Sequence, residues 1–206
     1  MYQPPAFLAD AQAATGLIAD HPLAQLVVSC ADGLLATPVP LLWRGDSLVG
    51  HLARPNSLWR HEGAALAIFT GAQAYVSPSW YPSKREHGKA VPTWNYETVH
   101  VHGTLVGHDD PEWKRAVLEL QTEWFERPSA VPWRIADAPS EYISAMIRGV
   151  VGIELTDLRI EGKAKLSQNR NEPDRQGVID ALTGGTAAQQ DVADAMRHRG
   201  MPDSPS

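Results

Sequence analysis

Residues 91–103, VPTWNYETVHVHG, contain the most regular strand pattern in the chain. Apolar residues occupy one parity of the pattern and of its continuation: Val99, Val101 and Leu105. Polar residues occupy the other: His100, His102 and Thr104. Because side chains alternate across a strand, the stretch predicts a strand with one apolar face and one histidine-bearing face.

Two histidines on one face of a strand can bind a metal ion. The chain has one cysteine, Cys30, and the spacing around His100 and His102 specifies no third ligand. A disulfide framework within one chain is excluded, and we predict no metal site. The alternative for this face is a polar row exposed to solvent or to a partner.

The composition is that of an ordinary globular protein, with 206 residues, 43% hydrophobic residues and a net charge of −6. An acidic chain offers no electrostatic argument for nucleic-acid binding. The N-terminus lacks the basic and apolar segments of a signal peptide, and no run is apolar enough to span a membrane. We therefore expect a soluble cytoplasmic protein.

Several short strands precede and follow the opening stretch, and turn residues separate them. Pro38 and Pro40 interrupt one strand, which places it at a sheet edge or at a bulge, because proline cannot donate to a ladder. The predicted strands cover residues 26–29, 34–43, 47–53, 65–71, 74–80 and 150–155. The predicted helices cover residues 11–19, 111–124, 140–147 and 171–182.

This order of elements predicts a mainly β fold, a barrel with peripheral helices, rather than a parallel α/β sheet. Asp110, Pro111 and Glu112 have the N-terminal signals of the helix that follows them. We predict one domain over residues 1–183. Residues 184–206 are predicted to be a C-terminal tail with a weak helical pattern, either mobile or lying across a partner.

The segment from Gly162 to Arg170, GKAKLSQNR, concentrates positive charge in an acidic chain. Lys163 and Lys165 share one face of an extended segment, so they can capture an anion such as phosphate. The alternative is a solvated basic loop. The segment lacks the glycine and the Ser or Thr of a P-loop.

A second candidate anion site is Gly50 to His61, GHLARPNSLWRH, where a predicted strand ends and a short helix begins. Asn56 or Ser57 can cap that helix, and Arg54 and Arg60 lie beside it in sequence. The helix start is a plausible phosphate nest or an ordinary capped turn. Signatures of serine hydrolases, zinc proteases and dinucleotide-binding folds are absent from the sequence.

Four motifs occur in the order seen in PaiB-type FMN-binding negative transcriptional regulators, which the chain resembles. They are HLARPNSLW, AYVSPSWY, VPTWNYETVHVHG and GKAKLSQN. The resemblance implies an FMN-binding split β-barrel, Greek-key-like, similar to the pyridoxamine-phosphate oxidase and flavin reductase barrels. It further implies a homodimer that holds FMN non-covalently at its interface.

By analogy with that wider fold, the resemblance assigns FMN-binding residues in four groups. The phosphate and ribityl chain are expected at His51, Leu52, Arg54, Asn56 and Ser57. The ring system is expected along Thr37, Pro38 and Val39. Its other side is expected at Thr98, Val99 and His100. Asn56 and Ser57 stand where related barrels carry basic ligands of the phosphate, so the positive charge is expected from Lys163 or Lys165 instead.

Other questions stay open at this stage. Trp94 and Tyr96 either contact FMN or fill the dimer core. Direct DNA binding has one basic tip in its favour, formed by Arg197, His198 and Arg199. The alternatives are a flavin-dependent oxidoreductase, its substrate bordered by His100, His102 and the loop 81–90, and a haem-binding barrel.

Overall fold

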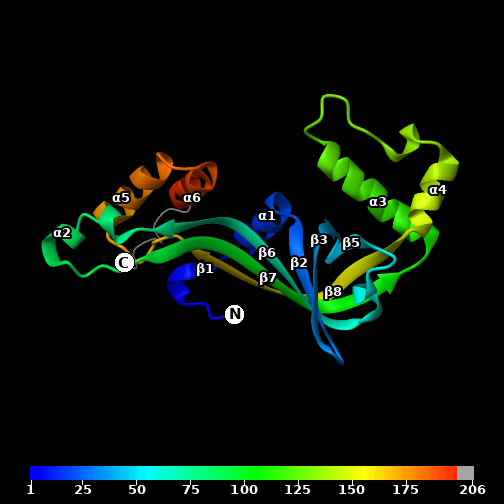
Figure 1. Cartoon of the computed structure of the whole chain (residues 1–206), viewed down its shortest axis with the longest axis horizontal. Coiled ribbons are helices and arrows are strands. Elements are labelled where there is room, and N and C mark those ends of the chain that lie inside the picture. The colour runs from blue at the N-terminus through cyan, green and yellow to red at the C-terminus, as the bar shows by residue number, and fades with distance from the viewer. Residues whose placement is uncertain (199–206) are drawn as a thin grey trace. The chain divides into compact units, whose positions relative to one another are not determined.

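The computed structural model describes residues 1–198 of the chain. Its strands form an eight-stranded sheet in the order β3-β2-β6-β7-β8-β5-β4, and β1 pairs with β8 (Figure 1). The strands are β1 (Leu8–Ala9), β2 (Leu23–Cys30), β3 (Gly33–Pro40), β4 (Leu42–Arg44), β5 (Ser47–Ala53), β6 (Gly63–Val76), β7 (Thr93–His108) and β8 (Val150–Lys165).

Helices connect and flank these strands. The α-helices are α1 (Ala11–Asp20), α2 (Lys84–His87), α3 (Pro111–Glu126), α4 (Ser140–Arg148), α5 (Glu172–Thr183) and α6 (Ala187–His198). Short 3-10 helices are η1 (Pro5–Phe7), η2 (Ser57–Arg60), η3 (Pro78–Trp80) and η4 (Ile135–Asp137). The registered pairs β1–β8, β2–β3, β2–β6, β4–β5 and β5–β8 are all antiparallel, which agrees with the predicted mainly β class. Within residues 1–198, no helix combines the length and apolar character needed to cross a bilayer.

The chain divides into two compact units, through both of which the long strands β6, β7 and β8 run. The first unit comprises Met1–Asp20, Thr70–Val99 and the chain from Glu161 onward. The second comprises His21–Phe69 and His100–Ile160.

The prediction of separate strands at 65–71 and 74–80 was wrong, because both belong to β6. Gly71 resembles a strand break in the sequence, but it serves close packing inside the strand. A Cβ atom at Gly71 would lie 3.0 Å from Leu17 Cδ1 and 3.3 Å from Glu97 Cβ. Likewise, the predicted strand at 150–155 continues to Lys165 as β8.

The core of the first unit joins α5 and α6 to the strands (Figure 1). The helix predicted at 171–182 is α5, and Asn171 is its N-cap rather than its first residue: Asn171 Oδ1 accepts from Asp174 N at 2.9 Å. Val192 and Met196 of α6 are fully buried. The predicted tail is therefore a packed helix up to His198, and the rest of it, including Arg199, lies outside the described residues.

In the second unit, α3 packs against β5 and α4 (Figure 1). Asp110 caps α3 as predicted: its Oδ1 accepts from Trp113 N at 2.7 Å. β3 lies at one end of the strand order, the edge position that Pro38 and Pro40 predict.

Gly50 of β5 permits the chain after β3 to pass close to β5. A Cβ atom at Gly50 would lie 2.6 Å from Pro40 O and 3.0 Å from Leu41 Cδ2, so a larger residue would displace one strand. This approach places the end of β3 beside the residue that follows Gly50, which is His51.

Candidate functional site

The turn after β5 is fixed to β3 by the side chain of Asn56. Asn56 caps η2, since its Oδ1 accepts from Leu58 N at 3.0 Å. Its Nδ2 donates to Thr37 Oγ1 at 3.3 Å. One side chain thus joins the turn predicted to hold the phosphate to the strand predicted to lie along the ring.

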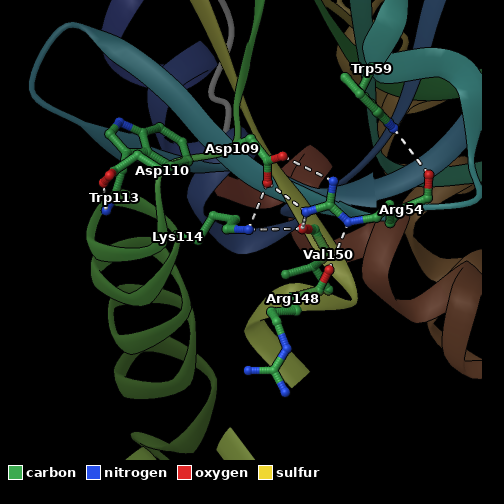
Figure 2. A network of polar contacts seen from close by, with 8 residues as sticks. All are labelled: Arg54, Trp59, Asp109, Asp110, Trp113, Lys114, Arg148 and Val150. Atoms are coloured by element: carbon green, nitrogen blue, oxygen red, sulfur yellow. Dashed lines mark hydrogen bonds and ion pairs between the residues drawn. The ribbon is translucent and has the colours of Figure 1, made fainter. Parts of the chain in front are cut away.

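Arg54 has structural partners on three sides (Figure 2). Its Nε donates to Arg148 O at 2.7 Å, and its Nη2 donates to Val150 O at 3.2 Å. Nη1 and Nη2 together hold the carboxylate of Asp109, at 3.0 and 2.5 Å. Because a guanidinium has five N–H donors, these bonds leave Arg54 one hydrogen, on Nη1, for a ligand.

Asp109 also neutralises a buried lysine (Figure 2). Lys114 Nζ donates to Asp109 Oδ1 at 2.8 Å and to Val150 O at 3.3 Å. The Arg54 guanidinium, and next Lys114, hold the pKa of the Asp109 carboxyl well below its usual range. The same contact with Asp109 raises the pKa of Arg54. This network fixes the end of β5, the start of β8 and the first turn of α3.

Two side chains at the turn have hydrogen-bond donors that could bind an anion. Within residues 1–198, the Ser57 hydroxyl makes no hydrogen bond, and the Arg60 guanidinium has no ion pair. Arg60 lies over the ring of Trp59, with its Cζ 5.2 Å from the ring centroid. Ser57 and Arg60 are the first and last residues of η2, and a hydroxyl and a guanidinium are donors of the kind that a phosphate group requires.

The predicted ring-binding strand offers backbone rather than side chains. Val39 and Leu52 are buried in the core of the second unit, so only their backbone atoms can meet a ligand. Pro38 has no N–H, and β3 has no further strand at its outer edge within the described residues. A flat ring with polar edges can meet such an edge through backbone groups and through the Thr37 hydroxyl, which accepts from Asn56 and keeps its own hydrogen.

His51 belongs to β5, before the turn, and it lines a groove. Its Nδ1 is 2.6 Å from Gln121 Oε1, and Gln121 Nε2 donates to Pro40 O at 3.0 Å. A groove of about 320 Å³ adjoins these residues, and α3 and Trp133 form its other walls.

Lys163, Lys165, Thr98 and Val99 belong to the first unit, whereas the other predicted site residues, including His100, belong to the second. Val99 is buried, so a ligand can meet only its backbone. The remaining predicted roles of these residues toward FMN stay predictions.

Both lysines have partners inside the first unit. Lys163 Nζ donates to Tyr2 O at 3.0 Å and lies 5.5 Å from the ring centroid of Tyr96. Lys165 Nζ donates to Thr93 Oγ1 at 2.5 Å and to Trp94 O at 2.6 Å. Burial, and then repulsion from nearby cations, lowers the pKa of Lys165.

Gln121, Phe125 and Trp133, which also line the groove, were not among the predicted site residues. Gln121 is buried on α3, four residues after the core residue Val117. A polar residue at a core position of an amphipathic helix requires a hydrogen-bond partner. The position of Gln121 in the helical pattern was therefore the one sign in the sequence that its side chain has a specific role. Nothing in the sequence indicates that Trp133 lies against α3.

Residues 1–157 match the model of a protein family described as "Putative FMN-binding domain". The chain is 34% identical over 155 residues to protease synthase and sporulation protein PAI 2 of Bacillus subtilis, covering 72% of each protein. It is 31% identical over 167 residues to an uncharacterized protein of Emericella nidulans, covering 75% of this chain and 66% of that protein. The motif GKAKLSQN lies beyond the residues that the family model matches.

Solved structures with a similar fold include the FAD and heme binding protein from Mycobacterium smegmatis. Its TM-score is 0.58 at 20% sequence identity, over 88% of this chain and 81% of that chain. The flavocytochrome Anf3 from Azotobacter vinelandii has a TM-score of 0.55 at 15% identity, over 82% and 71% of the two chains. These identities establish the fold alone, and the fold is the predicted split barrel with peripheral helices.

Proposed function

Because the chain belongs to the family of FMN-binding proteins that includes the PaiB-type regulators, we propose that Thr37–Val39 and the turn ending in Ser57 and Arg60 bind its FMN. FMN is the cofactor of this family, and bound FMN supplies electron or hydride transfer. The observation that carries the assignment is the Asn56 side chain. Its Nδ2 lies 3.3 Å from Thr37 Oγ1, and this hydrogen bond keeps the turn and β3, the two halves of the proposed site, together.

Ser57 and Arg60 hold the phosphate in this proposal. A phosphate dianion requires charge-assisted donors, and Arg60 is an exposed guanidinium without an ion pair within residues 1–198. Arg54 positions the turn instead, since four of its five hydrogens bind Asp109 and two carbonyls. In this proposal its remaining hydrogen, on Nη1, donates to the phosphate, the role that the resemblance implies for Arg54.

We also propose that the protein is a homodimer with FMN at the interface, as the resemblance implies. The β2–β3 hairpin supports this, because Leu34 at its tip is 75% exposed and the neighbouring outer edge of β3 is unpaired in the described chain. Sedimentation equilibrium with and without FMN tests the dimer. A monomer at micromolar concentration in both states would contradict it.

The regulatory role of the PaiB type is proposed to act through FMN or another small molecule rather than through direct reading of DNA. The chain is acidic, with a net charge of −6. Arg197, in the predicted basic tip, is bound to Asp194 at 2.6 Å and to Thr183 Oγ1 at 2.5 Å. Mobility shifts with promoter and random DNA at moderate salt test this, and specific promoter binding by the protein alone would contradict it.

A flavin-dependent oxidoreductase is the second candidate function. The groove beside His51 and Pro40 favours it, because a cavity of about 320 Å³ lies next to the strand proposed to hold the ring. Anaerobic addition of NADH or NADPH to the FMN-loaded protein tests it. An unchanged flavin absorption spectrum would exclude both nucleotides as reductants.

The absorption spectrum of the protein, and of the supernatant after heating, tests FMN binding directly. We expect flavin bands that move to the supernatant, because the binding is non-covalent. Arg60→Ala should weaken FMN binding by at least about tenfold, the effect of losing one charge-assisted hydrogen bond. Arg85→Ala, on the short helix α2, is the matched control and should leave FMN affinity unchanged.

A further inference from the structure

A groove in the second unit has walls that the proposed FMN site does not use. Its floor is one stripe of α3, in which Leu118, Gln121, Thr122 and Phe125 recur at helical spacing. Pro40 and His51 line it from the ends of β3 and β5, and Trp133 supplies a further wall, here called the side wall. Phe125 and Trp133 are 46% and 44% exposed, which is a large aromatic area to leave in water.

The polar side chains at the His51 end are arranged so that one ring nitrogen stays available. Gln121 Nε2 donates to Pro40 O, so Gln121 Oε1 is the acceptor toward His51. His51 Nδ1 therefore carries the hydrogen, and Nε2 of the neutral ring is an acceptor. Within residues 1–198, Nε2 makes no hydrogen bond.

The side chains of the floor and the side wall do not supply a donor for His51 Nε2. Thr122 Oγ1 donates to Leu118 O at 2.7 Å, so its hydroxyl is already bonded within the helix. The wall is anchored, because Trp133 N donates to Glu126 Oε2 at 3.0 Å. Ile135 follows it into a small core with Ile143 and Ile147. The groove is thus formed before any ligand arrives.

The charges around the groove disfavour an anionic ligand. A second cavity, of about 500 Å³, shares Thr122, Glu126 and Trp133 with the groove. Glu119 and Glu123 also line that cavity, and so do Arg134 and Arg127, whose Cζ lies 4.0 Å from the ring centroid of Trp124. The groove itself has one acidic residue in its lining, Glu126, and neither Lys nor Arg, so a phosphate-bearing ligand would meet a carboxylate there without a compensating cation.

We propose that this groove binds an uncharged, flat aromatic molecule that donates one hydroxyl to His51 Nε2, a phenol in chemical class. Phe125 and Trp133 contact the faces or edges of its ring, and Gln121 positions His51. The inference does not depend on FMN binding, since it uses only the groove, its aromatic walls and the tautomer of His51.

Calorimetric titration of the protein, FMN-free and FMN-saturated, with 2-naphthol and with naphthalene tests the proposal. The two probes differ only in the hydroxyl. We expect 2-naphthol to bind about two- to tenfold more tightly than naphthalene in both forms, the effect of one neutral hydrogen bond. The His51→Phe variant keeps a flat ring without the acceptor, so it should bind both probes equally.

The wild-type pair of titrations is decisive even if His51→Phe fails to fold. Equal affinity for the two probes, or no binding of either, would overturn the proposal. Displacement of 2-naphthol by one equivalent of FMN would also overturn it, by assigning the groove to FMN while leaving FMN binding intact. Trp133→Ala should weaken both probes together, and unchanged affinity in that variant would place the ligand elsewhere.

Discussion

The indole of Trp113 lies directly on the backbone of Gly152. A Cβ atom at Gly152 would stand 2.1 Å from Cζ3 and 2.6 Å from Cε3 of that indole. The ring of His108 stacks on this indole, with the two ring centroids 4.0 Å apart and an interplanar angle of 12°. The first turn of α3 is therefore fixed to β8 because residue 152 has no side chain. The next residue along α3, Lys114, is held there within reach of Val150 O.

Replacing Gly152 with alanine should destabilise the protein by about 1–3 kcal/mol, the usual cost of overpacking, because neither the strand nor the docked helix can move freely. Urea unfolding followed by circular dichroism measures this. In a Trp113→Ala background the same change should cost much less, since the two sites share one contact.

The control for that series is Gly16→Ala, in the interior of α1. A Cβ atom at Gly16 would meet nothing within 4 Å, and alanine is favoured over glycine in a helix. Gly16→Ala should therefore stabilise the protein by about 0.5–1 kcal/mol. A similar loss of stability from both substitutions would show that the contact with Trp113 is not the cause.

The Asp109 network should make stability depend on acid pH. Arg54 and Lys114 lower the pKa of Asp109 in the folded state below its unfolded value of about 3.9. Its contribution is thus complete above about pH 4 and is lost as the pH falls from there toward the folded pKa. Asp109→Asn should cost about 1–3 kcal/mol at pH 7, because buried Lys114 loses its counter-charge.

Urea unfolding of the wild type and Asp109→Asn at pH 7, 5, 4 and 3 tests this dependence. The difference between the two stabilities should be largest at pH 7 and 5, and it should shrink as the pH falls from 4 to 3. Asp46→Asn is the control, because Asp46 makes no hydrogen bond or ion pair in the described part of the chain. A constant difference between wild type and Asp109→Asn across this range would contradict the assigned ionisation.

Elements with local signals were predictable from the sequence. Asp110 and Pro111 begin α3 as their positions indicate, and the alternating pattern around Val99 and Val101 is a strand with those residues buried. β6 was divided wrongly because Gly71 is a common strand breaker. Its close approach to Leu17 and Glu97 depends on segments distant in sequence.

The partners of the site residues were less predictable, for the same physical reason. Lys163 and Lys165 alternate on one strand as expected, but Tyr2 and Thr93, which their ammonium groups contact, lie more than 70 residues away. Asn56 and Thr37, which are hydrogen-bonded, are also separated in the sequence, by the two strands β4 and β5. Residue type and spacing identify such groups, whereas tertiary contacts decide whether their donors are free.

Replacing Asn56 should weaken FMN binding more than the loss of the η2 cap alone would. Asn56→Ala removes both the cap of η2 and the bond to Thr37, and we expect a stability loss of about 1 kcal/mol together with weaker FMN binding. Thr37→Val removes only the link to Asn56, so it should keep the cap. FMN titration of both variants separates the two contacts.

Weaker FMN binding in both variants is expected, with the larger stability loss in Asn56→Ala alone. FMN affinity that stays at the wild-type value in both variants would remove the turn and β3 from the proposed site. Thermal unfolding of the FMN-free proteins supplies the stability comparison without the contribution of bound ligand.

Ser167 combines a buried hydrogen bond with an unfavourable backbone conformation. Its φ is 64°, in the left-handed region, and its Oγ is 3.0 Å from Nδ2 and 3.2 Å from Oδ1 of the fully buried Asn95. Ser167→Ala removes the hydroxyl but keeps the strain, so it should cost about 1–3 kcal/mol. Ser167→Gly removes both the hydroxyl and the strain, because glycine adopts positive φ readily, and it should cost less. Urea unfolding distinguishes the two, and a greater loss from glycine would mean that the hydroxyl does not compensate for backbone strain here.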